Sequence, residues 1–122
     1  MTKKFILEQC NRARAAIMEE MREFEKTWWE NHLNGHLKMI DIIIDYINQQ
    51  ENMTIDRDKF RKFLKKQKRK AMTIANDIYE KIESVTEPYE IAEKDYFIHD
   101  GMECQAKTFL DIVNKKFYYS KN

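Results

Sequence analysis

Residues 59–70 read Lys-Phe-Arg-Lys-Phe-Leu-Lys-Lys-Gln-Lys-Arg-Lys, a run of eight cations without an acidic residue. On an α-helix, where successive residues lie about 100° apart, Phe60, Phe63 and Leu64 share one arc. The cations fill the opposite face and form what we call the basic face: Lys59, Arg61, Lys62, Lys65, Lys66, Lys68, Arg69 and Lys70. The pattern therefore predicts an amphipathic helix with a core-facing stripe and a continuous positive surface.

The apolar spacing continues beyond this run, so we expect one long helix from about residue 56 to residue 85. Thr54 or Asp56 can serve as its N-cap, because a side-chain oxygen there accepts a hydrogen bond from the first turn. Its core stripe continues through Gln67, Ala71, Ile74, Ile78, Ile82 and Val85. Thr86-Glu87-Pro88 should end this helix and begin a short one, since proline is tolerated in a first helical turn.

Two further amphipathic segments precede the run. The first repeats apolar residues at spacings of three and four from Ile6 to Trp28, and we expect Asn34-Gly35 to close it. The second, residues 37–47, also has this spacing, which favours a helix over a strand despite its β-branched residues.

The C-terminal region predicts a turn at Asp100-Gly101, a last helix over residues 106–117, and a frayed tail over residues 118–122. The expected fold is all-α, a single domain over residues 1–122 built as a bundle of four or five helices. Two of these would have about thirty residues and a length of about 45 Å, which exceeds a compact domain of this size. We therefore expect a homodimer, in which a partner covers the projecting apolar stripe.

The formal net charge of +1 hides a strong segregation of charge. Residues 57–70 contain nine cations and one acid, Asp58, a net +8, so the rest of the chain carries −7. Acidic residues gather within 19–30 and 80–95. Such polarity indicates either an anionic partner or internal pairing between the basic face and the acidic first segment.

The remaining composition predicts a cytoplasmic protein. Cys10 and Cys104 are far apart in sequence and are expected to be free thiols in a reducing compartment. The apolar runs are far too short to span a membrane, and no N-terminal apolar segment resembles a secretion signal.

Two sets of residues are candidates for macromolecular binding. The basic face suits the phosphates of DNA or RNA, with arginines as bidentate donors and lysines as point charges. A protein interface is predicted at Trp29, Tyr118 and Tyr119, since exposed aromatics often dominate binding energy. The alternative is that Trp28 lies in the core stripe and Trp29 at its rim.

Metal binding is not expected from the sequence. His32 and His36 have the i,i+4 spacing of a metal-binding helix, but a helix stop at Asn34-Gly35 would separate them. Three or four ligands would also require Glu30, Asp41 or a distant cysteine. His99-Asp100 matches the doublet of HD-type metal phosphohydrolases in two residues only and is typical of a turn.

No glycine-rich phosphate loop, nucleophile motif or metal-ligand pattern is present, so we expect no enzyme activity, no cofactor and no catalytic residue. The leading prediction is a regulatory or inhibitory protein-interaction module that binds a protein partner. The Lys- and Ile-rich, Gly-poor composition is similar to that of small accessory proteins of phages and plasmids. The alternative is a nucleic-acid-binding accessory protein that uses the basic face, and a metal-dependent hydrolase is third.

Overall fold

The computed structural model describes residues 1–23, 27–83 and 89–120, with the side chains of these except 27, 82–83 and 89–92. This part of the chain forms four α-helices: α1 (Lys3–Glu23), α2 (Thr27–Asn48), α3 (Arg57–Glu83) and α4 (Tyr89–Val113). The predicted all-α fold is confirmed. The predicted boundary at Thr86-Glu87-Pro88 lies outside the described residues. None of the described helices is long and apolar enough to cross a membrane.

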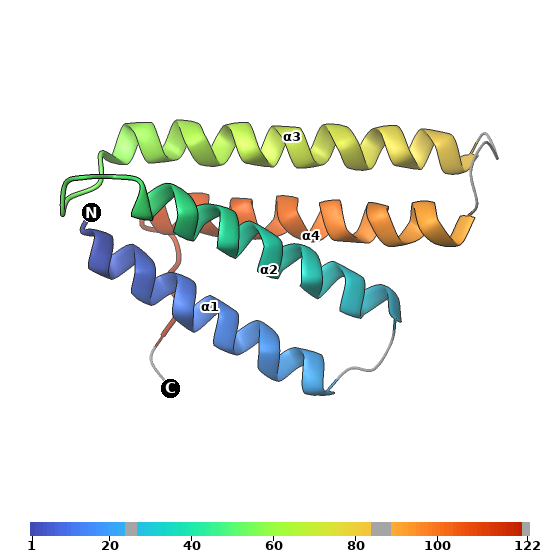
Figure 1. Ribbon diagram of the computed structural model, residues 1–122, viewed down its shortest axis with the longest axis horizontal. Helices are drawn as coiled ribbons and strands as arrows, with labels where there is room; N and C mark the ends of the chain where they lie inside the picture. The colour runs from blue at the N-terminus through green and yellow to red at the C-terminus, as the bar shows by residue number, and fades with distance from the viewer. Residues whose placement is uncertain (24–26, 84–88, 121–122) are drawn as a thin grey trace.

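The helices pack in the order α3, α4, α2 and α1. α3 and α4 run antiparallel along the length of the molecule, α2 crosses α4, and α1 packs against α2 (Figure 1). Within the described residues, α1 makes no helix-to-helix contact with α3. The N-terminus lies beside the start of α3.

The N-termini of α1 and α3 are joined by backbone pairing. Residues 1–3 and 53–55 form an isolated antiparallel bridge with Thr2 opposite Thr54, held by hydrogen bonds of 2.9 and 2.7 Å. Each helix is then capped by the residue before it. Thr2 Oγ1 accepts the Phe5 N–H at 3.1 Å, so it satisfies one of the free donors of the first turn of α1.

Asp56 is the N-cap of α3. Its Oδ1 accepts the Lys59 backbone N–H at 3.0 Å, and this hydrogen bond is the main reason that its pKa is lowered. Of the two N-caps that the sequence allowed, the structure selects Asp56, while Thr54 takes part in the bridge. The predicted start of the long helix is thus confirmed.

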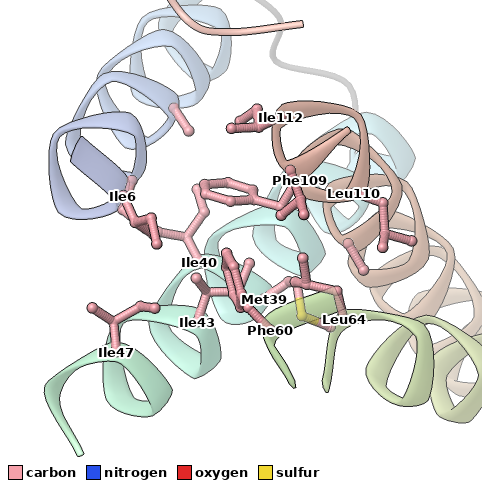
Figure 2. Close-up of a cluster of buried hydrophobic side chains, with 14 of the residues drawn as sticks. Ile6, Met39, Ile40, Ile43, Ile47, Phe60, Leu64, Phe109, Leu110 and Ile112 are labelled. Carbon is pink, nitrogen blue, oxygen red and sulfur yellow. The ribbon is translucent and has the colours of Figure 1, made fainter. Parts of the chain in front are cut away.

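The hydrophobic core is built from buried side chains of all four helices (Figure 2). α3 contributes Phe60 and Leu64, and the C-terminal half of α4 contributes Phe109 and Val113, all without exposed surface. One face of α1 and the part of α2 from Leu33 onward add Ile6, Cys10, Ala13, Ile17, Leu33, Met39, Ile40, Ile43 and Ile47. Removing one large core side chain should cost about 2–5 kcal/mol of unfolding free energy.

The stripe predicted for α3 is confirmed in its N-terminal half. Phe60, Leu64 and Ala71 are buried there. Three members are only half-buried, Gln67, Ile74 and Ile78, while the side chains of Ile82 and Val85 lie outside the described residues. The C-terminal half of α3 therefore packs less deeply than its N-terminal half, because most of the core residues lie beside the N-terminal half.

Both glycines were wrongly predicted to mark helix ends. Gly35 lies inside α2 and Gly101 inside α4, and both are buried. A Cβ at Gly35 would overlap the Ile98 carbonyl oxygen, and one at Gly101 would overlap that of His32. The glycines are needed because the two helix backbones touch where they cross.

The helix boundaries change accordingly. α1 ends at Glu23, so the first helix is shorter than predicted, and α2 continues from Thr27 through Asn34-Gly35. The turn at Asp100-Gly101 and the separate short helix are also wrong, since α4 is continuous there. α3, with 27 residues, is confirmed as a long helix.

The C-terminal end of α4 closes with a Schellman motif. Lys115 has a left-handed backbone with φ of 61°, and its N–H reaches the Ile112 oxygen at 3.1 Å. The Lys116 N–H reaches the Asp111 oxygen at 2.8 Å. This turn directs the following residues back across the molecule toward α1, where Tyr119 is held.

Candidate functional site

The basic face lies on the solvent side of α3. Phe60 and Leu64 face inward, while six of its eight cations are exposed: Lys59, Lys62, Lys65, Lys66, Arg69 and Lys70. Arg61 and Lys68 are half-buried. The structure thus gathers the predicted residues on one surface.

Only one of these cations has a partner side chain in the described structure. Arg61 pairs with Asp58 at 2.7 Å and donates to Asn114 Oδ1 at 3.0 Å. The other seven make no ion pair with any described residue. The acidic residues of α1 do not cover them, because α1 packs against α2 and not against α3.

The three residues predicted for a protein interface have different surroundings. Trp29 is half-buried, stacks on His32 with ring centres 5.0 Å apart, and donates to Glu20 Oε1 at 3.2 Å. Tyr119 is also half-buried, whereas Tyr118 is 67% exposed. Trp28, expected in the core stripe, is 46% exposed instead.

A buried polar network, which the sequence analysis missed, connects the C-terminal tail to the helices. Gln9 of α1 has no exposed surface, and its amide pairs with both backbone groups of Tyr119, at 2.6 Å for the N–H and 3.2 Å for the oxygen. Arg12 donates to the same Tyr119 oxygen at 2.9 Å. The tail is therefore held in place at Tyr119, and the prediction that it frays there is wrong.

Gln105 of α4 continues the network. It has no exposed surface, and its Nε2 donates to the Tyr119 hydroxyl at 3.2 Å. Its Oε1 lies 2.7 Å from His36 Nδ1. Because an amide oxygen can only accept, His36 carries its proton on Nδ1 and points the lone pair of Nε2 away from Gln105.

His32 lies one turn before His36 on α2. Its Nδ1 is 3.2 Å from Asp100 Oδ2, and its Nε2 is 3.2 Å from His36 Nε2. The carboxylate of Asp100 accepts from His32 Nδ1, so the Nε2 atoms of both rings face each other. Burial is the main cause that lowers the pKa of His36, which favours its neutral form.

Cys104 joins these two histidines from α4. His32, His36 and Cys104 form what we call the histidine–cysteine cluster, and their ligand atoms all lie within 4.8 Å of one another. Burial, with nearby Asp100 and Glu103, raises the pKa of the Cys104 thiol. A raised pKa opposes a role as a free nucleophile, but imidazole and sulfur are good ligands for a transition metal.

The sequence carried one signal of this cluster, the i,i+4 spacing of His32 and His36. Asn34-Gly35 predicts a helix stop that would separate the two rings, but α2 is continuous through these residues, so the objection does not hold. The contribution of Cys104 could not be found from its position, since it depends on how α4 crosses α2. His99 lies outside the cluster, with its Nδ1 2.8 Å from the Asp95 oxygen.

Comparison with known proteins gave no further guide to the site. A scan against protein-family models found no match, and searches of curated proteins and of solved structures found none either.

Proposed function

We propose that this protein binds nucleic acid through the basic face of α3. The observation that carries the proposal is that seven of the eight cations lack an ion-pair partner among the described residues. In an ordinary solvated helix, acids at i,i+3 or i,i+4 spacing relieve such crowding, and here Asp58, paired with Arg61, is the one acidic residue on this stretch of α3. The phosphates of a nucleic acid would supply the missing negative charge.

The dimensions of the basic face suit a short stretch of backbone. From Lys59 to Lys70 the helix rises about 17 Å, which corresponds to roughly five base pairs of duplex DNA. Lysines make sequence-independent contacts to phosphate, so the proposal is binding without base readout and without catalysis. The half-buried Arg61, already paired with Asp58, is not assigned a phosphate.

The test is binding of the purified chain to a generic DNA duplex and a generic single-stranded RNA over a salt series. We expect log affinity to fall linearly with log salt, with a slope no steeper than about −6, since at most seven cations are available. Reversal of Lys65, Lys66, Arg69 and Lys70 to glutamate should abolish binding.

A matched control distinguishes the effect of the basic face from the effect of the net charge. Reversal of Lys4, Lys38, Lys94 and Lys107, which are exposed on the other helices, changes the net charge equally. The proposal requires that this control retains most of the affinity. Equal loss in both variants, unchanged binding by the α3 variant, or binding of poly-glutamate in preference to DNA and RNA would each contradict it.

Protein interaction and homodimerisation, the leading prediction from sequence, are a second candidate favoured by the exposure of Tyr118. This side chain, with Phe5 and Phe117, lines a pocket of about 490 Å³ beside Met1 and Thr2 at the N-terminus. If two copies associate there, Tyr118→Ala should lower the dimer fraction in sedimentation equilibrium, while Met53→Ala, at a side chain that is also largely exposed, should not. A wild-type chain that stays monomeric at high concentration would remove this candidate.

A further inference from the structure

We infer that the histidine–cysteine cluster binds a divalent transition metal ion of the zinc class. The three ligands are His32 Nε2, His36 Nε2 and Cys104 Sγ, and solvent takes a fourth position. This inference is independent of the proposed nucleic-acid function, because the cluster lies on α2 and α4 and the basic face on α3.

The spacing of the two imidazole nitrogens fits one metal ion. Zn–N bonds of about 2.0–2.1 Å at a tetrahedral centre place two nitrogens about 3.3–3.4 Å apart. His32 Nε2 and His36 Nε2 are 3.2 Å apart. The ligand atom of Cys104, its sulfur, lies within 4.8 Å of those of both histidines, so all three residues can contribute to one metal ion with a Zn–S bond of about 2.3 Å.

The hydrogen bonds around the cluster orient both rings as metal ligands. Gln105 Oε1 accepts from His36 Nδ1 at 2.7 Å, and Asp100 Oδ2 accepts from His32 Nδ1 at 3.2 Å. Metal-bound histidines characteristically donate their second ring N–H to such an oxygen. With both Nδ1 atoms so engaged, the two Nε2 atoms face each other 3.2 Å apart and are both available to one cation.

The glycine crossing explains how a cysteine on one helix reaches two histidines on another. Gly101 of α4 lies against the His32 carbonyl, and a Cβ there would be 3.2 Å from the Gly35 Cα. Cys104 follows Gly101 by three residues, so it lies on the same face of α4. The short cysteine side chain spans the gap because the two backbones are in contact.

The test uses the full chain, reduced and stripped of metal with a chelator, and titrated with Co²⁺ and then Zn²⁺. We expect the intense visible bands of a tetrahedral Co²⁺ site and a thiolate-to-cobalt charge-transfer band, saturating at one equivalent and displaced by Zn²⁺. Cys104→Ser should lose the charge-transfer band with its far-ultraviolet circular dichroism unchanged. Asp100→Asn, which keeps all three ligands, should weaken Zn²⁺ binding by about 10–100-fold.

Two control variants test the assignment of the ligands. Cys10→Ala removes the other thiol, and His99→Gln removes the histidine outside the cluster, so both should leave the cobalt spectrum intact. Absence of tetrahedral bands in the wild type would overturn the inference. So would a charge-transfer band that survives Cys104→Ser or one that disappears with Cys10→Ala.

Discussion

Gly35 of α2 and Gly101 of α4 lie against each other at the point where the two helices cross, and neither position has room for a side chain. This contact sets the separation of the two helices. It also places the histidine–cysteine cluster, since His36 follows Gly35 directly and Cys104 follows Gly101 by one turn.

Gly35→Ala should destabilise the protein, although it improves helix propensity. At an open helical position this change would add about 0.5–1 kcal/mol to the unfolding free energy. Here the new methyl group meets the Ile98 backbone, so we expect a loss of about 3 kcal/mol by overpacking. Urea denaturation followed by tryptophan fluorescence measures it. The exposed Lys38→Ala is the control, and a stabilised Gly35→Ala would contradict the close crossing.

Gln9→Leu should release the C-terminal tail. The variant leaves the Tyr119 N–H without its partner, and we expect a cost of about 1–3 kcal/mol because these groups are half-buried. Limited proteolysis with chymotrypsin should then cut faster after Phe117 and Tyr118. The exposed Gln49→Leu serves as the control, and equal cleavage of Gln9→Leu and wild type would show that the amide does not hold the tail.

Alkaline pH should destabilise the protein through Cys10. Burial raises the pKa of this thiol from 9.0 to about 12, against a smaller opposing effect of Arg14. Between these values the unfolded chain has lost the thiol proton while the folded chain retains it. The unfolding free energy should therefore fall by about 1.4 kcal/mol per pH unit above pH 9 from this group.

Comparison of wild type with Cys10→Ala isolates this contribution, since tyrosines and lysines titrate in the same range in both proteins. Chemical denaturation at intervals from pH 8 to pH 10.5 should give a shallower decline for the variant. If the two proteins decline in parallel, Cys10 is not protected in the folded state.

Lys66→Glu should stabilise the isolated protein. Lys66 has Lys62 one turn before it and Lys70 one turn after it, so the reversal turns two like-charge pairs into two opposite pairs. We expect a gain of about 0.5–1 kcal/mol at low salt that largely disappears at 1 M salt. Lys66→Gln should give a smaller gain. A salt-independent effect, or none, would mean that the cations of the basic face do not repel one another.

The helix α3 was well predicted because its signals are local. Its cap at Asp56, its stripe through Phe60 and Leu64 and its charged outer face all follow from spacing along the chain. Failures occurred at Gly35 and Gly101, since a glycine that ends a helix and a glycine that admits a neighbouring backbone have the same side chain. Trp28 was expected in the core stripe and Trp29 at its rim, but Trp28 is exposed and Trp29 is half-buried. The spacing of the first segment does not extend to these residues, because they belong to α2, which begins at Thr27.

The amino-acid order alone was sufficient for the all-α class, the amphipathic α3 and the segregation of its charge, because helical periodicity and charge act between residues a few positions apart. Contacts over long sequence distances decided the rest. Gln9 meets Tyr119, and Cys104 meets His32 and His36, only because α1, α2 and α4 pack in one particular way. That packing depends on shape complementarity between helix surfaces, which no short window of sequence contains.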